Sequence, residues 1–171
     1  IAVNLRDEDE LVSAGLASNE DDLMLVSRRA QSVRFHANDS ILRPMGRATS
    51  GVTGMKFRPG DSLLSMSVIE AGTDPDLFVV FENGVAKRTA ASQWTPKGRG
   101  IYGVTAANSG KGGQLVGALT VEPGDEVMVV MERGNIVRSR VDEVSRTGRN
   151  TMGVSFALPN KGDAIVAVAR N

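Results

Sequence analysis

The sequence repeats itself with a period of about fifty residues, and this repetition constrains the fold more than any other feature. A Gly-Arg-x-x-x-Gly-Val pattern recurs at offsets of 52 and 50, over residues 46–52, 98–104 and 148–154. A second landmark, an aliphatic residue that opens an apolar stretch, recurs at offsets of 52, 52 and 50, at Leu11, Leu63, Leu115 and Ile165. Two landmarks on one period indicate a series of similar structural units.

Each unit is composed of short β-strand patterns. Residues 77–81 form an apolar run, Asn83-Gly84 supplies a pair of residues suited to positive φ in a tight turn, and residues 85–89 form the return strand. The first and third units repeat this arrangement, and we see no sustained helical periodicity. The pattern predicts an all-β fold with about four antiparallel strands per unit, as in propeller blades.

The landmarks divide the chain into repeats at 1–51, 52–103 and 104–153, with a partial closing repeat at 154–171. Propellers usually close with four to eight blades, so we expect these units to form part of a larger ring. The chain also starts with isoleucine, which suggests a piece of a longer protein. We expect the final partial repeat to donate strands to its neighbour.

Charge is segregated within each repeat, although the whole chain has a formal net charge of zero. The windows 28–47, 82–99 and 132–149 together hold fourteen basic and five acidic residues, so the remainder of the chain is acidic by the same amount. Two arginine columns recur in every unit: Arg34, Arg88 and Arg138 on the return strand, and Arg47, Arg99 and Arg149 in the Gly-Arg pattern. Other basic residues surround these columns, including Lys87, Lys97, Arg140 and Arg146.

Repeated arginines around a ring would form a curved cationic track, which suits the phosphates of a bent duplex. Few aromatic residues are available for base stacking, and Trp94 shares its column with Leu42 and Val144, which indicates a core position. These observations favour duplex DNA as the partner. Two alternatives remain open: the arginines could pair with Glu82, Glu132 or Asp142, or the columns could bind an acidic protein.

Enzymatic and metal chemistry find little support in the sequence. Cysteine is absent, the single histidine (His36) has no triad or metal cluster around it, and no apolar run is long enough to span a membrane. The literal Gly98-x-Gly100-x-x-Gly103 match does not open a helical pattern, so it is no dinucleotide fingerprint. We therefore expect no catalytic residues, no metal site and no cofactor in this chain.

The repeats, above all residues 42–52 (Leu-Arg-Pro-Met-Gly-Arg-Ala-Thr-Ser-Gly-Val), resemble the C-terminal domains of the DNA gyrase A family along the whole chain. The resemblance implies a six-bladed β-pinwheel, of which this chain would be the C-terminal half, part of one domain over residues 1–171. The family's Gln-Arg-Arg-Gly-Gly-Lys-Gly box is not present in these residues. Residues 97–103 are the nearest copy, and they keep only Arg99, Gly100 and Gly103 of it.

The resemblance also implies a function. Such domains wrap duplex DNA so that a type II topoisomerase can introduce negative supercoils at the expense of ATP. The partners would be DNA, the remainder of the gyrase A protein and the gyrase B protein in a heterotetramer, in the cytoplasm at the nucleoid. ATP and Mg²⁺ would bind outside this chain, and Tyr102 would not be the DNA-cleaving tyrosine. The equivalent domain of topoisomerase IV is an alternative, although the regular landmarks favour gyrase.

Overall fold

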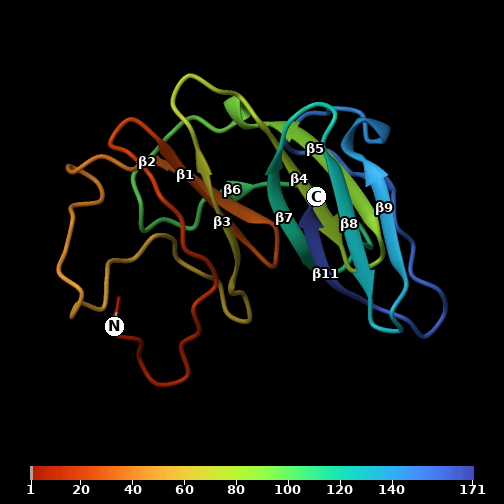
Figure 1. Ribbon diagram of the computed structural model, residues 1–171, viewed down its shortest axis with the longest axis horizontal. Helices are drawn as coiled ribbons and strands as arrows, with labels where there is room; N and C mark the ends of the chain where they lie inside the picture. Colours follow the sequence, from red (N-terminus) through yellow and green to blue (C-terminus); the bar gives the residue numbers. More distant parts are fainter. Residues whose placement is uncertain (1) are drawn as a thin grey trace.

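Three antiparallel β-sheets lie side by side in the computed structural model, which describes residues 2–171 (Figure 1). Sheet 1 has the order β3-β1-β2-β6, sheet 2 has the order β10-β5-β4-β7, and sheet 3 has the order β11-β8-β9. The bounds are β1 Asp22–Ser27, β2 Gln31–His36, β3 Leu63–Ile69, β4 Asp76–Phe81, β5 Val85–Ala90, β6 Val104–Thr105, β7 Leu115–Val121, β8 Glu126–Met131, β9 Ile136–Arg140, β10 Val154–Ser155 and β11 Ile165–Arg170. Short 3₁₀ helices, η1 (Ala91–Gln93) and η2 (Val141–Glu143), follow β5 and β9. The all-β, propeller-like fold predicted from the sequence is confirmed.

Each sheet contains a tight hairpin, as predicted. β1 pairs with β2, β4 with β5, and β8 with β9. One detail of the prediction is wrong: Gly84 has a φ of 81°, but Asn83 is not among the residues with positive φ. Asn83 instead accepts a hydrogen bond from the amide of Val85 through its side-chain oxygen, at 3.1 Å. The turn therefore needs only one left-handed residue, and Ala30 and Gly134 supply it in the other two hairpins.

Strands are exchanged between successive repeats. β3 pairs with β1, β7 with β4, and β11 with β8. The strands that begin at the landmarks Leu63, Leu115 and Ile165 therefore each join the hairpin of the preceding repeat. The two-residue strands β6 and β10 reach one repeat further back and pair with β2 and β5. Both strands of the closing repeat are donated, but only β11 joins the neighbouring repeat as expected, since β10 joins the second repeat. Leu11 begins no strand and is exposed, because no hairpin precedes it among the described residues.

The core occupies the spaces between the sheets. In β4, Leu77 and Val79 belong to the cluster shared with sheet 1, whereas Phe78 and Val80 belong to the cluster shared with sheet 3. β4 is therefore buried on both faces, which explains why its sequence is a continuous apolar run rather than an alternating one. Trp94 is buried in the first cluster, which confirms its predicted core position. No helix among residues 2–171 is long and apolar enough to cross a membrane.

Candidate nucleic-acid interface

The Gly-Arg-x-x-x-Gly-Val segments, here called the arginine loops (46–52, 98–104 and 148–154), lead in the second and third repeats directly into the donated short strands. A Cβ atom on Gly153 would lie 2.2 Å from the carbonyl oxygen of Ala86, and one on Gly103 would lie 2.2 Å from that of Ser32. The second glycine of the pattern is thus needed for close approach to the neighbouring sheet. Around Gly51 nothing lies within 4 Å of the corresponding point.

The arginines of the second and third loops are held by backbone carbonyls. Arg99 donates from Nε to the carbonyl oxygen of Ile41 at 2.8 Å and from Nη1 to that of Thr53 at 3.1 Å. Arg149 donates from Nη1 to the carbonyl oxygen of Thr105 at 2.8 Å. Both residues remain half-buried, whereas Arg47 in the first loop is exposed. Arg99 and Arg149 therefore have fixed guanidinium groups with further N–H donors.

The return-strand arginines pair with an acidic residue at the start of the same hairpin. Arg34 donates from Nε to Asp22 at 2.7 Å, and Arg88 Nε lies 3.5 Å from Asp76. In the third hairpin Arg138 pairs with Glu126, an interaction that lowers the pKa of the Glu126 carboxyl. The three acidic residues stand twelve positions before their arginines. This column of carboxylates was missed in the sequence, although its constant spacing could have revealed it.

The following repeat decides how exposed each return-strand arginine is. The side chains of Arg34 and Arg88 are 15% and 12% exposed, whereas that of Arg138 is 57% exposed. Arg34 also donates to the carbonyl oxygen of Ala91, and Arg88 donates to Asp142, and both of these partners belong to the next repeat. Sheet 3 has no further sheet packed after it among the described residues, which leaves Arg138 accessible.

The remaining predicted basic residues also differ in how exposed their side chains are. Lys97, Arg140 and Arg146 are exposed, but Lys87 is buried. Arg146 lies 2.7 Å from Asp76, and this contact raises the pKa of the Arg146 guanidinium. Arg140 donates to Asp142, one of the three pairing partners considered from the sequence. The pKa of Asp142 is lowered, mainly by its hydrogen bond with Arg88.

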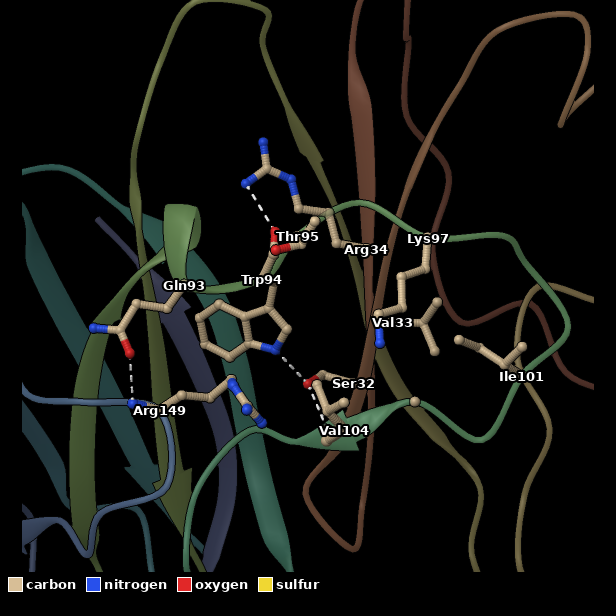
Figure 2. Close-up of a pocket in the computed structure, with 11 residues that line it drawn as sticks. Ser32, Val33, Arg34, Gln93, Trp94, Thr95, Lys97, Ile101, Val104 and Arg149 are labelled. Atoms are coloured by element: carbon tan, nitrogen blue, oxygen red, sulfur yellow. Dashed lines mark hydrogen bonds between the residues drawn. The ribbon is translucent and has the colours of Figure 1, made fainter.

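A pocket of about 120 Å³ lies where the three repeats meet, beside β2 and β6 of sheet 1 (Figure 2). Trp94 forms part of its wall and donates from Nε1 to the hydroxyl of Ser32 at 2.7 Å. Beside it, Gln93 accepts a hydrogen bond from the backbone amide of Arg149 at 2.8 Å (Figure 2). Lys97 also lines the pocket. The structure therefore brings basic residues of all three repeats, Arg34, Lys97 and Arg149, to one pocket.

This arrangement is suited to binding an extended anion. Exposed cations lie on all three repeats, and the two half-buried loop arginines are held in place before any ligand arrives. Fixed donors lose less conformational entropy on binding than free ones. Within residues 2–171, no group of three acidic or histidine side chains is placed to hold a metal ion. Whether each predicted arginine contacts DNA stays a prediction, but the burial of Arg34, Arg88 and Lys87 gives these three a structural role.

Comparison with known proteins gives a consistent match. The family described as "DNA gyrase C-terminal domain, beta-propeller" matches residues 1–18, 21–70 and 125–171. The DNA gyrase A protein of Streptomyces coelicolor is 51% identical over 177 aligned residues that cover the whole chain, and that of Mycobacterium tuberculosis H37Rv is 48% identical over 172. The chain spans about a fifth of the length of these relatives.

Solved structures agree with the sequence matches. The C-terminal domain of a DNA gyrase A superposes with a TM-score of 0.86 at 28% identity, over 99% of this chain and 57% of the other. The C-terminal domain of a topoisomerase IV superposes with a TM-score of 0.89 at 19% identity, over 99% of this chain and 52% of the other. The second likeness shows a shared fold, and it agrees with the propeller description of the matching family.

Proposed function

Because this chain belongs to the family of DNA gyrase C-terminal domains, we propose that it binds duplex DNA without sequence specificity and bends or wraps it. The chain serves as a binding module and carries no catalysis of its own. Its parent protein is a gyrase-like type II topoisomerase, and the wrapped DNA supports ATP-dependent negative supercoiling. Its partners are duplex DNA, the remainder of the gyrase A protein, and the gyrase B protein in a heterotetramer in the cytoplasm. ATP and Mg²⁺ bind elsewhere in that assembly.

One observation carries the proposal: exposed basic side chains lie on all three repeats, next to two loop arginines, Arg99 and Arg149, whose guanidinium groups are held by backbone carbonyls. The exposed members of the predicted set are Arg47, Lys97, Arg138, Arg140 and Arg146. Such contacts neutralise phosphates and release counterions, and they carry no information about base sequence. A second function, binding of an acidic protein by the same residues, would use the same charges but would not need the regular 52- and 50-residue spacing of Arg47, Arg99 and Arg149.

The salt dependence of duplex binding tests the proposal. Replacing the five exposed residues by glutamine should make the slope of log affinity against log salt shallower by roughly 0.9 per phosphate contact, or about 4.5 in all. The matched control replaces five exposed basic residues outside the basic windows: Arg6, Lys56, Arg58, Lys111 and Lys161. An equal change of slope in both variants would contradict the proposed interface, and absence of duplex binding in the wild type would favour the acidic-protein alternative.

Wrapping is tested separately from binding. A circular plasmid is relaxed by a nicking and ligation cycle in the presence of the chain, and the topoisomers are then separated by gel electrophoresis. Because three sheets offer only part of an arc, we expect a small change of linking number per bound chain. A distribution that stays unchanged at saturating protein would show that the chain binds the duplex without curving it.

A further inference from the structure

Lys87 is the one lysine of the described chain that is fully buried, with 1% of its surface exposed. Its ammonium group donates three hydrogen bonds: to the Thr89 hydroxyl at 2.8 Å, to the Ala106 carbonyl at 3.0 Å and to the Arg149 carbonyl at 2.6 Å. All three N–H donors of the ammonium are therefore used. None of these partners is a carboxylate, so the buried charge is held by dipoles alone.

The other two hairpins do not require a lysine at this place. In the strand register, Lys87 faces Val79 as Val33 faces Leu25 and Val137 faces Val129. A valine suffices in the first and third hairpins, and burying an ammonium is far more costly than burying a valine. The charge at Lys87 therefore serves something other than filling space between the sheets.

We infer that Lys87 is a positioning residue, whose ammonium fixes the third arginine loop on sheet 2 so that Arg149 is presented to a DNA phosphate. The inference rests on the proposed function and extends it to a residue that does not itself touch DNA. Lys87 is inaccessible to a phosphate, in contrast to the exposed Lys97.

The contacts around Arg149 support this role. Its backbone amide donates to Gln93, its carbonyl accepts from Lys87, and its guanidinium donates to Thr105. Two of these three restraints are side chains of the second repeat acting on a loop of the third. Lys87 also binds the carbonyl of Ala106, whose amide donates to the Ala30 carbonyl of the first hairpin at 2.7 Å. One buried ammonium thus connects the loop to all three repeats.

Protonation of Lys87 should control the restraint. Burial, together with the nearby charge of Arg149, lowers the pKa of Lys87 to about 8. Arg149 is the charged group that faces the ammonium, and the neighbouring Thr89 hydroxyl and Ala106 carbonyl do not titrate. Loss of the proton above pH 8 weakens the hydrogen bond to the Arg149 carbonyl, because hydrogen bonds from charged donors are roughly twice as strong as neutral ones.

A double-mutant cycle on the 171-residue chain tests the inference, with fluorescently labelled duplex DNA at fixed ionic strength. Lys87→Met and Arg149→Gln should each weaken DNA binding about tenfold, as for one lost charge-assisted hydrogen bond. The double variant should also bind about tenfold more weakly than the wild type, because both substitutions remove the same contact. The matched control Lys97→Met removes an exposed charge of the same kind, and its effect should multiply with that of Arg149→Gln. Multiplying effects of Lys87→Met and Arg149→Gln would overturn the inference.

A pH series gives a second readout that loss of a simple packing contact would not change. Wild-type affinity should fall severalfold between pH 7 and pH 9, and Lys97→Met should show the same fall. Lys87→Met should be flat over this range. A flat wild-type profile would overturn the inference even if the Lys87→Met chain failed to fold. If the wild type does not bind duplex DNA at all, the proposed function fails instead.

Discussion

The guanidinium of Arg88 donates from Nη1 to the carboxylate of Asp142 at 2.9 Å, and this hydrogen bond joins the second repeat to the third. Arg88 also lies beside the fully buried Asp76 of its own hairpin. A residue that was expected to contact DNA thus connects two sheets. Its exposed equivalent, Arg138, pairs with Glu126 at the open end of the arc.

Replacing Arg88 with alanine should destabilise the fold far more than replacing Arg138. Arg88→Ala removes one of the two guanidinium groups beside the buried carboxylate of Asp76, and because Arg146 remains 2.7 Å from it the expected loss of unfolding free energy is about 1.5–3 kcal/mol. Arg138→Ala breaks an exposed pair that solvent screens, and it should have little effect on stability. Urea unfolding in the absence of DNA measures the unfolding free energy of both variants. Equal losses would mean that the interface between repeats does not depend on Arg88.

The second and third arginine loops should tolerate alanine at their first glycine but not at their last. Gly153→Ala places a methyl group against the Ala86 carbonyl oxygen and should displace β10, at a cost of about 1–3 kcal/mol. Gly98→Ala is the matched control, since nothing lies within 4 Å of its Cβ position. Thermal unfolding compares the two variants. Similar melting temperatures would show that β10 can shift without penalty.

Stability should depend on pH through Lys87. Its pKa is about 8 in the folded chain and ordinary in the unfolded chain, so between these values the unfolded state binds more protons. Unfolding free energy should therefore rise with pH above about 8, by at most about 1.4 kcal/mol per pH unit from this residue. Below pH 8 this contribution does not vary. Chemical denaturation of the wild type and Lys87→Met from pH 7 to 10 isolates the contribution of Lys87, and parallel curves would show that folding does not lower the pKa of Lys87.

Duplex binding should be insensitive to base sequence. The described residues present no helix that could enter the major groove, and the exposed cations suit phosphates rather than base edges. Competition between unrelated duplexes of equal length should give affinities that differ far less than the roughly 10³-fold typical of specific binders. A mild preference for flexible steps is compatible with bending, whereas a single strongly preferred site is not.

The period of the sequence was enough to predict the sheets and hairpins, because each hairpin is a local structure with its own apolar pattern and turn. Trp94 could be placed in the core for the same reason, since its column is apolar in every repeat. The exchange of β3 and β7 between repeats could not be predicted from these local patterns. Strand pairing over long sequence separation leaves no local signal, and a leucine landmark looks the same whichever hairpin it joins.

The roles of the basic residues were less predictable. A column of arginines indicates that something periodic is bound, but it does not reveal that Arg34 and Arg88 are mostly buried while Arg138, which also pairs with a carboxylate, stays exposed. That difference arises because each repeat covers the one before it, so burial depends on position in the arc rather than on the local sequence. Lys87 is the extreme case, since its three partners come from two repeats.

Strand donation also has a consequence for the order in which the protein matures on the ribosome. The hydroxyl of Ser32 donates to the carbonyl of Val104, which is synthesised 72 positions later. At roughly 5–20 residues per second, the first sheet waits several seconds for its last strand. During that interval the edge of β2 is unpaired, and such edges are templates for pairing with other chains. A nascent chain of this design is thus most vulnerable to aggregation before its second arginine loop emerges, which makes the speed of translation through residues 37–105 a determinant of yield.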